Sequence, residues 1–389
     1  MTRATRDDGK LAIVHVLRAP VGGLFRHVRD LAREQVARGH RVGLFADSAT
    51  GGASGNAALA AMAPDLAVGL RRARIHRLPH WTDVAAVAAL RRFLAEAKPD
   101  VVHGHGAKGG AYARIAPGRR DAGRPVVAYT PHGGSFHYAP GGAAHRAFMA
   151  AERALARRTD LFVFECAYME RRAREKIGGL PGLVRVAPNG VSPAEFEPVA
   201  QDPDADDFLY VGELRAAKGV DLLLEALAAL RRGPMPGARL ALVGSGPEER
   251  ALHDEAVALG LEGATRFLGA MPARAAFAKG RTLVMPSRAE SLPYVALEAA
   301  AATMPLVATA VGGMPEILGP QSARLVKPGD AAALAAAMAA EAGLSSDARA
   351  ARDAALAARV RGSFSVGAMV DNVEAAYRDA LAARDGASA

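Results

Sequence analysis

The chain has 389 residues, of which 50% are hydrophobic, and a single cysteine, Cys166. This length favours two domains with a core each, and one cysteine excludes an internal disulfide and fits a reducing compartment. No apolar run approaches the roughly 20 residues of a membrane span, and the polar first ten residues lead into no signal-peptide core. We therefore expect a cytoplasmic protein, either free or peripheral on the inner face of the membrane.

The net charge of +9 is unevenly distributed along the chain. Residues 1–190 carry 30 Lys and Arg against 15 Asp and Glu, a balance of +15, whereas the remainder carries 19 against 25, a balance of −6. A basic half can face an anionic membrane surface, a lipid diphosphate or nucleic acid. Solvated arginines in an Ala- and Arg-rich composition explain the same balance, so charge alone does not choose between these partners.

The first elements predict a doubly wound α/β domain. An apolar strand at 11–17 leads through a glycine-rich turn into a helix that starts at Leu24 and ends at Gly39, and a second strand follows at 41–46. The turn after this first strand lacks the dinucleotide fingerprint Gly-x-Gly-x-x-Gly. In the turn, Gly22 and Gly23 let the backbone come close to a bound group.

Small residues over 47–70 predict a loop with at most a short helix, and a strand is expected at 74–78. A helix should follow from Thr82 or Asp83 to about Ala97, with Trp81 packing just before it.

A strand ending near residue 105 turns into a helix at about Ala107. Ligands of open α/β sheets bind outside the carboxyl ends of strands, so His105 lies where chemistry can occur. For His103 we expect a structural role instead.

The next strand, 125–129, runs into Thr130-Pro131-His132-Gly133-Gly134-Ser135-Phe136-His137-Tyr138. Glycines beside a histidine on a loop at a strand end make His132 a candidate for a functional role, with His137 and Tyr138 close to it in the chain. Helices at 144–157 and 167–176 and strands at 160–165 and 183–186 complete the first domain. Turn formers and acids over 187–203 then predict a domain boundary.

The second half restarts with a buried strand at 208–212, a loop that carries Arg215 and Lys218, and an apolar helix at 220–230. A strand at 239–243 then reaches a tight turn containing Gly244 and Gly246, where a base or ribose can lie against backbone. A further strand at 265–269 includes Leu268.

The stretch 283–300 combines a short strand, a loop with Glu290 and a helix that starts at Pro293 and contains Glu298. The free N–H groups of a helix start attract phosphate, and carboxylates accept hydrogen bonds from sugar hydroxyls. Together these features suit a nucleotide sugar. Alanine-rich helices at 331–361 and a last helix at 365–382 end the chain.

Several of these motifs resemble one enzyme family. Glu290 and Glu298, eight positions apart after Pro-Ser and before Ala-Ala, resemble the Glu-x7-Glu signature of retaining GT-B glycosyltransferases of family 4, glycosyl transferase group 1. The Tyr-Thr-Pro-His-Gly-Gly-Ser stretch around His132 resembles the branch that builds exopolysaccharide and lipopolysaccharide. The likeness extends over about residues 11–380 in the family's order.

The resemblance implies an α/β, GT-B fold of two Rossmann-like parallel-sheet domains facing across a cleft. Residues 1–190 would form the acceptor-side domain and 191–362 the nucleotide-sugar domain, and 363–389 would form a helix that packs back on the first. The implied activity is retaining transfer of a hexose from a UDP- or GDP-sugar to a lipid-linked or oligosaccharide acceptor in cell-surface polysaccharide synthesis.

The resemblance also assigns roles to residues. It makes His132, Glu290 and Lys218 catalytic, and it places three residues on the acceptor side: His105, His137 and Tyr138. The donor-binding set comprises Gly22, Gly23, Arg215, Lys218, Gly244, Gly246, Leu268, Ser291, Leu292, Pro293, Tyr294, Val295 and Glu298. Glu213 departs from the pattern, because many members carry Arg there, and Arg215 is the candidate substitute. We expect no Asp-x-Asp or His/Cys cluster to offer a metal site in the cleft, and therefore no metal and no other cofactor.

Two alternatives stay open at this point. A nucleotide-sugar epimerase or a phosphorylase of the same fold would contain similar donor motifs. A basic nucleic-acid-binding protein would need a recognition helix or an aromatic stacking platform, and the sequence shows neither.

Overall fold

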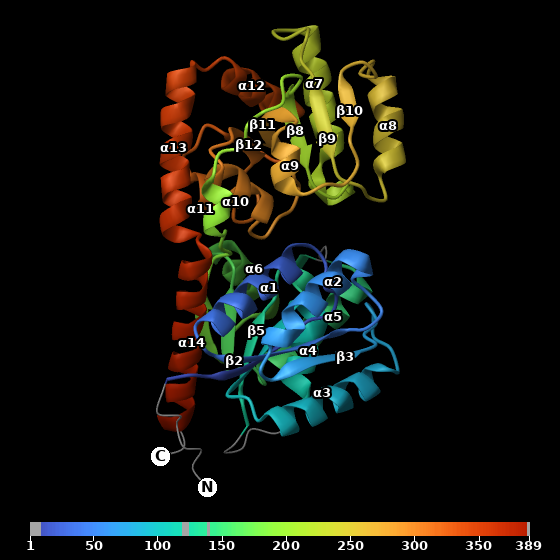
Figure 1. The fold of residues 1–389 in the computed structure, drawn as a ribbon. Coiled ribbons are helices and arrows are strands. Elements are labelled where there is room, and N and C mark those ends of the chain that lie inside the picture. Colours follow the sequence, from blue (N-terminus) through green and yellow to red (C-terminus); the bar gives the residue numbers. More distant parts are fainter. Residues whose placement is uncertain (1–8, 119–123, 138–140, 387–389) are drawn as a thin grey trace. The chain divides into compact units, whose positions relative to one another are not determined.

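The computed structural model describes residues 9–118, 124–137 and 141–386. It divides into two compact units (Figure 1): unit 1 comprises residues 1–189 and 366–389, and unit 2 comprises residues 190–365. Each unit contains a sheet whose strand pairings are all parallel. This is the Rossmann-like arrangement that the alternation of strands and helices predicted.

Within its described residues, unit 1 has a seven-stranded sheet of order β3-β2-β1-β4-β5-β6-β7. Its strands are β1 (Ala12–Val16), β2 (Arg41–Asp47), β3 (Gly69–Ala73), β4 (Val101–His105), β5 (Val126–Thr130), β6 (Leu161–Phe164) and β7 (Leu183–Val186). Its α-helices are α1 (Gly22–Ala37), α2 (Gly52–Met62), α3 (Asp83–Ala97), α4 (Gly106–Ile115), α5 (Ala143–Ala156), α6 (Ala167–Ile177) and α14 (Val366–Gly386), and its 3-10 helices are η1 (Ala63–Asp65) and η2 (Gly134–His137). The central strands β1, β4 and β5 are buried throughout, and for β1 the apolar run predicted this.

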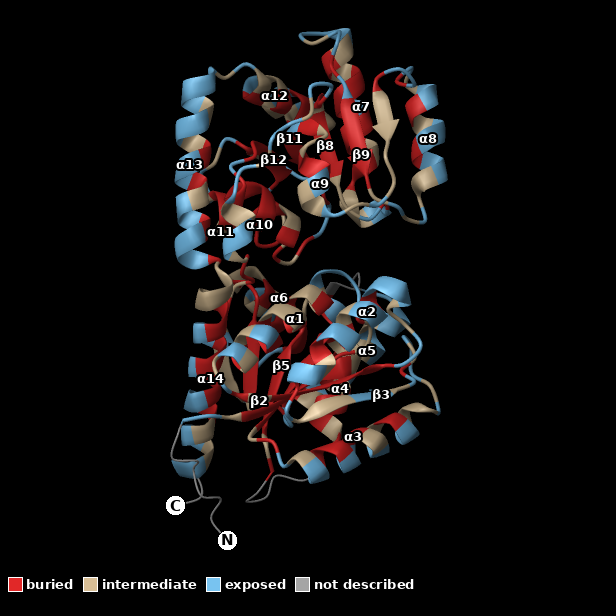
Figure 2. Cartoon of the chain, in the orientation of Figure 1, coloured by how far each residue is buried: buried red, intermediate tan, exposed pale blue. Residues whose placement is uncertain are grey.

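The last helix, α14, belongs to the core of unit 1. Met369, Val373 and Tyr377 are buried in one cluster with Ile13 of β1 and Leu31 of α1. Figure 2 shows the resulting alternation of buried and exposed residues along α14. The one-face spacing of its apolar residues therefore places this distant segment beside the first strand of the chain.

Unit 2 has, in the part of the chain described, a six-stranded sheet of order β10-β9-β8-β11-β12-β13. Its strands are β8 (Asp206–Val211), β9 (Leu240–Val243), β10 (Thr265–Phe267), β11 (Gly280–Met285), β12 (Leu306–Thr309) and β13 (Leu325–Val326). Its helices are α7 (Val220–Arg232), α8 (Glu249–Ala258), α9 (Ala273–Phe277), α10 (Tyr294–Ala301), α11 (Met314–Leu318), α12 (Ala331–Ala342) and α13 (Ser346–Ser363), with 3-10 helices η3 (Pro193–Phe196) and η4 (Ala216–Lys218).

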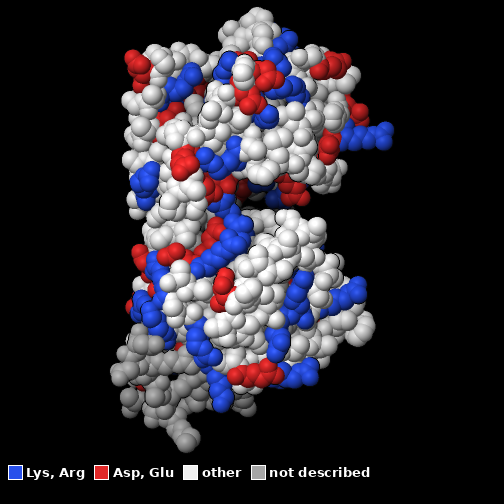
Figure 3. All heavy atoms as spheres, viewed as in Figure 1, with Lys and Arg blue, Asp and Glu red and all other residues white. Residues whose placement is uncertain are grey.

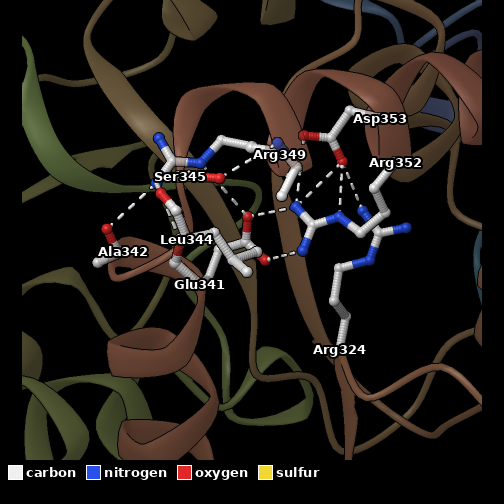
Figure 4. Close-up of polar contacts among 9 residues, drawn as sticks. Arg324, Glu341, Ala342, Leu344, Ser345, Arg349, Arg352 and Asp353 are labelled. Carbon is white, nitrogen blue, oxygen red and sulfur yellow. Dashed lines mark hydrogen bonds and ion pairs between the residues drawn. The ribbon is translucent and has the colours of Figure 1, made fainter.

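A buried charge cluster fixes α13 in unit 2 (Figure 4). Arg324, just before β13, lies 2.8 Å from Asp353 of α13, and Arg352 bridges Asp353 and Glu341 of α12. Asp353 and Glu341 are both nearly inaccessible to solvent. Since removing one partner of a buried pair leaves an uncompensated charge, this cluster stabilises the position of α13 and is a structural feature.

The strand order reverses once in each unit. In unit 1 the chain moves outward from β1 to β3 on one side and from β4 to β7 on the other, and in unit 2 the reversal lies between β8 and β11. Loops leaving two neighbouring strands on opposite sides of the sheet open a crevice at this switch point, where α/β proteins bind ligands. The candidate residues of each unit are therefore expected beside β1 and β4, and beside β8 and β11.

Two expectations for the first half were wrong. The third strand is β3, at 69–73 rather than 74–78. Within the expected loop of 47–70, residues 52–62 form α2, the short helix that the sequence allowed. β3 pairs only with β2 among the described strands, and such an edge strand tolerates charged residues such as Arg71 and Arg72, so no apolar run marks it. Trp81 is 80% exposed and lies against His80 instead of packing into the core.

Among the helices in the described ranges, none has both the length and the apolar character that crossing a bilayer requires.

Candidate functional site

Lys218 and Glu290 form an ion pair at the switch point of unit 2. Lys218 ends η4 in the loop after β8, Glu290 lies in the loop after β11, and 2.6 Å separates Nζ from Oε1. The Ser287 hydroxyl donates to the same carboxylate oxygen at 2.7 Å. The two loops also share a backbone bond of 2.9 Å from Arg288 N to Ala217 O. Two of the three expected catalytic residues are thus in direct contact.

Glycines make this close fit possible. At Gly219, with φ +66°, an added Cβ would lie 2.3 Å from the Pro286 carbonyl oxygen, and at Gly312, with φ +59°, it would lie 2.3 Å from the Glu290 carbonyl oxygen. The Gly313 amide donates to Ser291 O at 2.6 Å. The backbone around Glu290 is therefore held on both sides by loops that leave no room for a side chain.

Gly244, Gly246 and Leu268 lie together at the same edge of the sheet. A Cβ on Gly244 would lie 1.8 Å from the Gly212 carbonyl oxygen, and one on Gly246 would lie 2.3 Å from that of Leu214. The Gly244 amide donates to the carbonyl oxygen of residue 269, next to Leu268. This edge exposes backbone where larger residues would have covered it, which suits recognition through main-chain groups.

The helix α10 begins at Tyr294, one residue after Pro293, so that Ser291, Leu292 and Pro293 form its approach and Val295 its first turn. A helix N-terminus carries partial positive charge and attracts anions. Glu298 lies inside the same helix and is 8% exposed. Residues 291–298 therefore follow directly after Glu290, the acid of the Lys218–Glu290 pair.

Arg215 forms an ion pair with Glu213, which leaves it less available to an anionic ligand. Its Nε lies 2.9 Å from the carboxylate of Glu213, and both side chains are about half exposed. The acid that departs from the family pattern thus neutralises the arginine that is the candidate substitute.

In unit 1 the corresponding position holds five histidines: His15 from β1, His27 from α1, His103 and His105 from β4, and His132 after β5. His105 lies 3.0 Å from His15 and 3.1 Å from His132, measured between ring nitrogens. The rings of His27 and His132 meet edge to face, with centroids 4.7 Å apart. Of the predicted residues, His105 and His132 are therefore in contact.

His103 has the structural role expected of it. Its two ring nitrogens bond the Tyr377 hydroxyl at 2.7 Å and the Thr130 hydroxyl at 2.8 Å. The ring is fully buried. It therefore joins α14 to the strands β4 and β5.

All five imidazoles are neutral at physiological pH. Burial lowers the pKa of His15 and of His27 to about 4. Burial, and then the neighbouring histidines, hold the pKa of His103 and His105 well below the usual value, and burial together with His27 does the same for His132. The switch point of unit 1 thus offers hydrogen-bond donors and acceptors without charge.

The loop that carries His132 is strained and anchored. His132 has φ +49°, which is uncommon for a residue other than glycine. Three residues further on, the Ser135 hydroxyl donates to buried Glu152 at 2.6 Å, and Glu152 pairs with buried Arg114 at 2.8 Å. Strain that the surrounding structure maintains is typical of functional positions.

The remaining predicted residues have less defined surroundings. Gly22 and Gly23 are exposed and begin α1, two residues earlier than expected, with φ +67° at Gly22. His137 ends η2, and Tyr138 lies outside the described residues.

Sequence reasoning missed His15, His27, Gln35, Asn189 and Glu152 as members of these clusters. A polar residue inside an otherwise apolar strand was the available signal for His15. The other four gave none, because they look like ordinary polar positions on helices or in the linker.

The arginines of unit 1 do not form one basic stripe on the face that Figure 3 shows, where they lie scattered among neutral and acidic residues. Several have acidic partners, such as Arg26 with Asp30 at 3.3 Å and Arg185 with Asp379 at 2.8 Å. The positive balance of this half is therefore partly compensated locally.

Comparison with known proteins decides the family. The family model described as Glycosyl transferases group 1 matches residues 205–341, and that of the Glycosyl transferase 4-like domain matches residues 22–190. Glycogen synthase from Mycobacterium tuberculosis (strain CDC 1551 / Oshkosh) is 31% identical over 344 residues, which cover 82% of each chain. The chain belongs to the group 1 glycosyltransferases.

Solved structures support the same fold for this glycosyltransferase. Sucrose-phosphate synthase from Thermosynechococcus elongatus superposes with a TM-score of 0.77 at 22% identity, over 96% of this chain and 100% of that one. Anabaena Alr3699/HepE in complex with UDP-glucose gives a TM-score of 0.74 at 18% identity, over 96% and 100%. The expected GT-B fold of two Rossmann-like domains is thereby confirmed.

Proposed function

We propose that this glycosyltransferase moves a hexose, with retention of configuration, from a nucleoside diphosphate sugar to a lipid-linked or oligosaccharide acceptor in cell-surface polysaccharide synthesis. The observation that carries the proposal is the contact of Lys218 with Glu290 directly before the N-terminus of α10, at the switch point of unit 2. A cation, a helix N-terminus and a carboxylate at one place suit a diphosphate bonded to a sugar.

In this proposal unit 2 binds the donor. Lys218 and the backbone at 291–295 stabilise the diphosphate leaving group, and Arg215 assists once the donor draws it from Glu213. Glu290 holds sugar hydroxyls and Glu298 the ribose, while the nucleobase lies against the backbone near Gly244, Gly246 and Leu268. Because Lys218 and α10 supply the positive charge, the transfer itself needs no metal.

Unit 1 takes the acceptor side and supports the reacting sugar. His132 positions the donor sugar, and His105, His137 and Tyr138 contact the acceptor, while Gly22 and Gly23 admit the diphosphate. Neutral imidazoles suit this task because they form hydrogen bonds with hydroxyl groups and carry no charge that would attract an anion. A lipid-linked acceptor would bring the protein to the inner face of the membrane.

The relatives support a nucleotide-sugar donor. The Anabaena structures contain UDP, UDP with glucose, or UDP-glucose. The Mycobacterium relative is a glycogen synthase, which makes an α-glucan a second candidate for the acceptor. UDP-glucose is therefore the first donor to test.

A thermal-shift screen over UDP, GDP, ADP and their sugars identifies the donor, because a ligand of the native state raises the melting temperature. Turnover is then measured with lipid-linked saccharides, with malto-oligosaccharides and with no acceptor. Products from lipid-linked saccharides support the first candidate, and products from malto-oligosaccharides support the second. Conversion of the donor to its epimer without an acceptor would indicate an epimerase instead of a transferase. Release of sugar 1-phosphate from an oligosaccharide and inorganic phosphate would indicate a phosphorylase. The product anomer tests retention.

Glu290→Ala is the decisive variant, with exposed Glu262→Ala as its control. We expect Glu290→Ala to lose at least 100-fold in kcat/KM, since an interaction with the reacting sugar is removed, and the control to keep wild-type turnover. Wild-type transfer by Glu290→Ala would refute the assignment.

A further inference from the structure

Three of the clustered histidines of unit 1 have a geometry that hydrogen bonding alone does not explain. His27, His105 and His132 each offer a ring nitrogen within 4.8 Å of those of the other two. They come from α1, the end of β4 and the loop after β5, so the grouping lies entirely within unit 1.

The protons of this group can be placed from its partners. The Asn189 Oδ1 atom accepts a hydrogen bond from His27 Nδ1 at 3.0 Å, which puts the proton on Nδ1 and a lone pair on Nε2. That Nε2 atom is buried and has no hydrogen-bond partner within the described part of the chain. A buried acceptor without a partner is costly, and the structure keeps this one beside two further imidazoles.

The protons of His105 can also be placed from its hydrogen-bond partners. The Gln35 Oε1 atom accepts from His15 Nε2 at 2.8 Å, so His15 Nδ1 accepts from His105 Nε2 at 3.0 Å. His105 Nδ1 then carries a lone pair, to which His132 Nε2 donates at 3.1 Å. His132 is less buried than the other two, so its proton can move to its other nitrogen and an ion has a route of entry.

We propose that His27, His105 and His132 form a binding site for a divalent transition ion of the Zn²⁺ class. Two nitrogens bound to one tetrahedral zinc ion lie about 3.3 Å apart, close to the separation of His105 from His132. Asn189 and the pair His15–Gln35 act as the outer acceptors that orient metal-binding imidazoles. Three histidines leave a fourth position for water or another oxygen ligand.

The other grouping, of His15, His103 and His105, is the weaker candidate. Both ring nitrogens of His15 and of His103 already have hydrogen-bond partners. An ion there would have to displace a hydrogen-bond partner from each of these two rings, whereas at His27 it fills a vacant acceptor. The proposal shares His105 and His132 with the transfer site proposed above, so an ion bound there would occupy nitrogens that the proposed function offers to the sugar and the acceptor. Its test is metal binding, which can be measured without transfer activity.

The test uses the full chain, stripped of metal and titrated with Zn²⁺ alone against a chromogenic chelator. We expect one ion per chain, at least tenfold weaker binding in His27→Asn, His105→Asn and His132→Asn, and 10- to 100-fold weaker binding in Asn189→Ala. His253→Asn, whose ring stacks on Phe267 in unit 2, should bind as the wild type does. His80→Asn tests the stacked surface pair His76–His80, the rival site.

A second measurement needs no variant. Co²⁺ bound by the wild-type chain should give the strong visible absorption of a four-coordinate site, and Zn²⁺ should slow amide exchange in peptides from 22–37 and 126–137. The proposal is overturned if the wild type binds Zn²⁺ no better than the three variants, if only His80→Asn loses binding, or if the cobalt spectrum is that of a six-coordinate aqueous ion.

Discussion

The two units place their candidate residues at the same topological position and give them opposite electrostatic character. At the β1–β4 switch point unit 1 gathers buried, neutral imidazoles, whereas at the β8–β11 switch point unit 2 holds the charged pair Lys218–Glu290. The doubly wound fold determines where a ligand can bind. In the function proposed above, the side chains there select the ligand, which is a hydroxyl group in unit 1 and a diphosphate in unit 2.

The two sites also differ in how they are built. His15, His103 and His105 lie within strands, so the sheet itself fixes them. Lys218 and Glu290 lie in loops, and glycines such as Gly219 and Gly312 hold those loops together. The candidate site of unit 1 therefore depends on the burial of its side chains, whereas that of unit 2 depends on charge and on close backbone contact. Substitutions in each unit can test this difference.

The largest effect is expected from removing the positive charge of Lys218 from the candidate site of unit 2. Lys218→Ala should lower kcat/KM by about 100- to 1000-fold, because the leaving diphosphate loses its cation, and Lys218→Arg should retain more activity than Lys218→Ala. Exposed Lys327→Ala is the matched control and should leave turnover unchanged. Near-normal turnover in Lys218→Ala would show that charge at this switch point does not serve the reaction.

Gly244→Ala tests the backbone contact of unit 2. The new Cβ would lie 1.8 Å from the Gly212 carbonyl oxygen at a φ of +144°, so we expect a loss of about 3 kcal/mol or more in the free energy of unfolding. Gly263→Ala, with open space around it, should change stability by less than about 1 kcal/mol. Urea unfolding of both variants measures this difference. Equal unfolding midpoints for Gly244→Ala and Gly263→Ala would mean that the loop at Gly244 moves to admit the new Cβ at little cost.

The sequence predicted the parts of this comparison that depend on local pattern. Apolar runs predicted buried strands such as β1 and β11. Turn residues over 187–203 predicted a domain boundary, and unit 2 starts at residue 190. It failed at β3, because an edge strand needs no apolar run. It also could not show that His27 meets His132, or that Asn189 bonds His27, since these contacts arise from the folding of segments far apart in the chain.

Acid should separate the units by stability. The pKa of His15 and of His27 falls from 6.5 to about 4 on folding, so the unfolded chain binds more protons. The two neutral histidines therefore contribute their full share to the free energy of unfolding above pH 6.5. This contribution is lost as the pH falls toward 4, by up to about 1.4 kcal/mol per pH unit for each histidine.

Hydrogen exchange at pH 7.5, 5.5 and 4.5, corrected for intrinsic rates and run with a chelator present, measures this loss by region. Peptides from β1 and β4 should lose protection at a higher pH than peptides from β8 and β11, because unit 2 has one histidine, His253, outside its switch point. Simultaneous loss in both units would show that the buried imidazoles do not limit the stability of unit 1.

The smallest expected effect concerns Arg215 and Glu213. Their ion pair is exposed, so Arg215→Ala should change the free energy of unfolding by less than about 1 kcal/mol. If Arg215 helps Lys218 to bind the diphosphate, the donor KM should rise several-fold in Arg215→Ala and fall in Glu213→Ala, which frees the arginine. Exposed Arg250→Ala serves as the control for lost charge. A donor KM unchanged in both variants would leave Lys218 and the N-terminus of α10 as the whole of the positive charge, because the acid at position 213 would then hold Arg215 away from the donor.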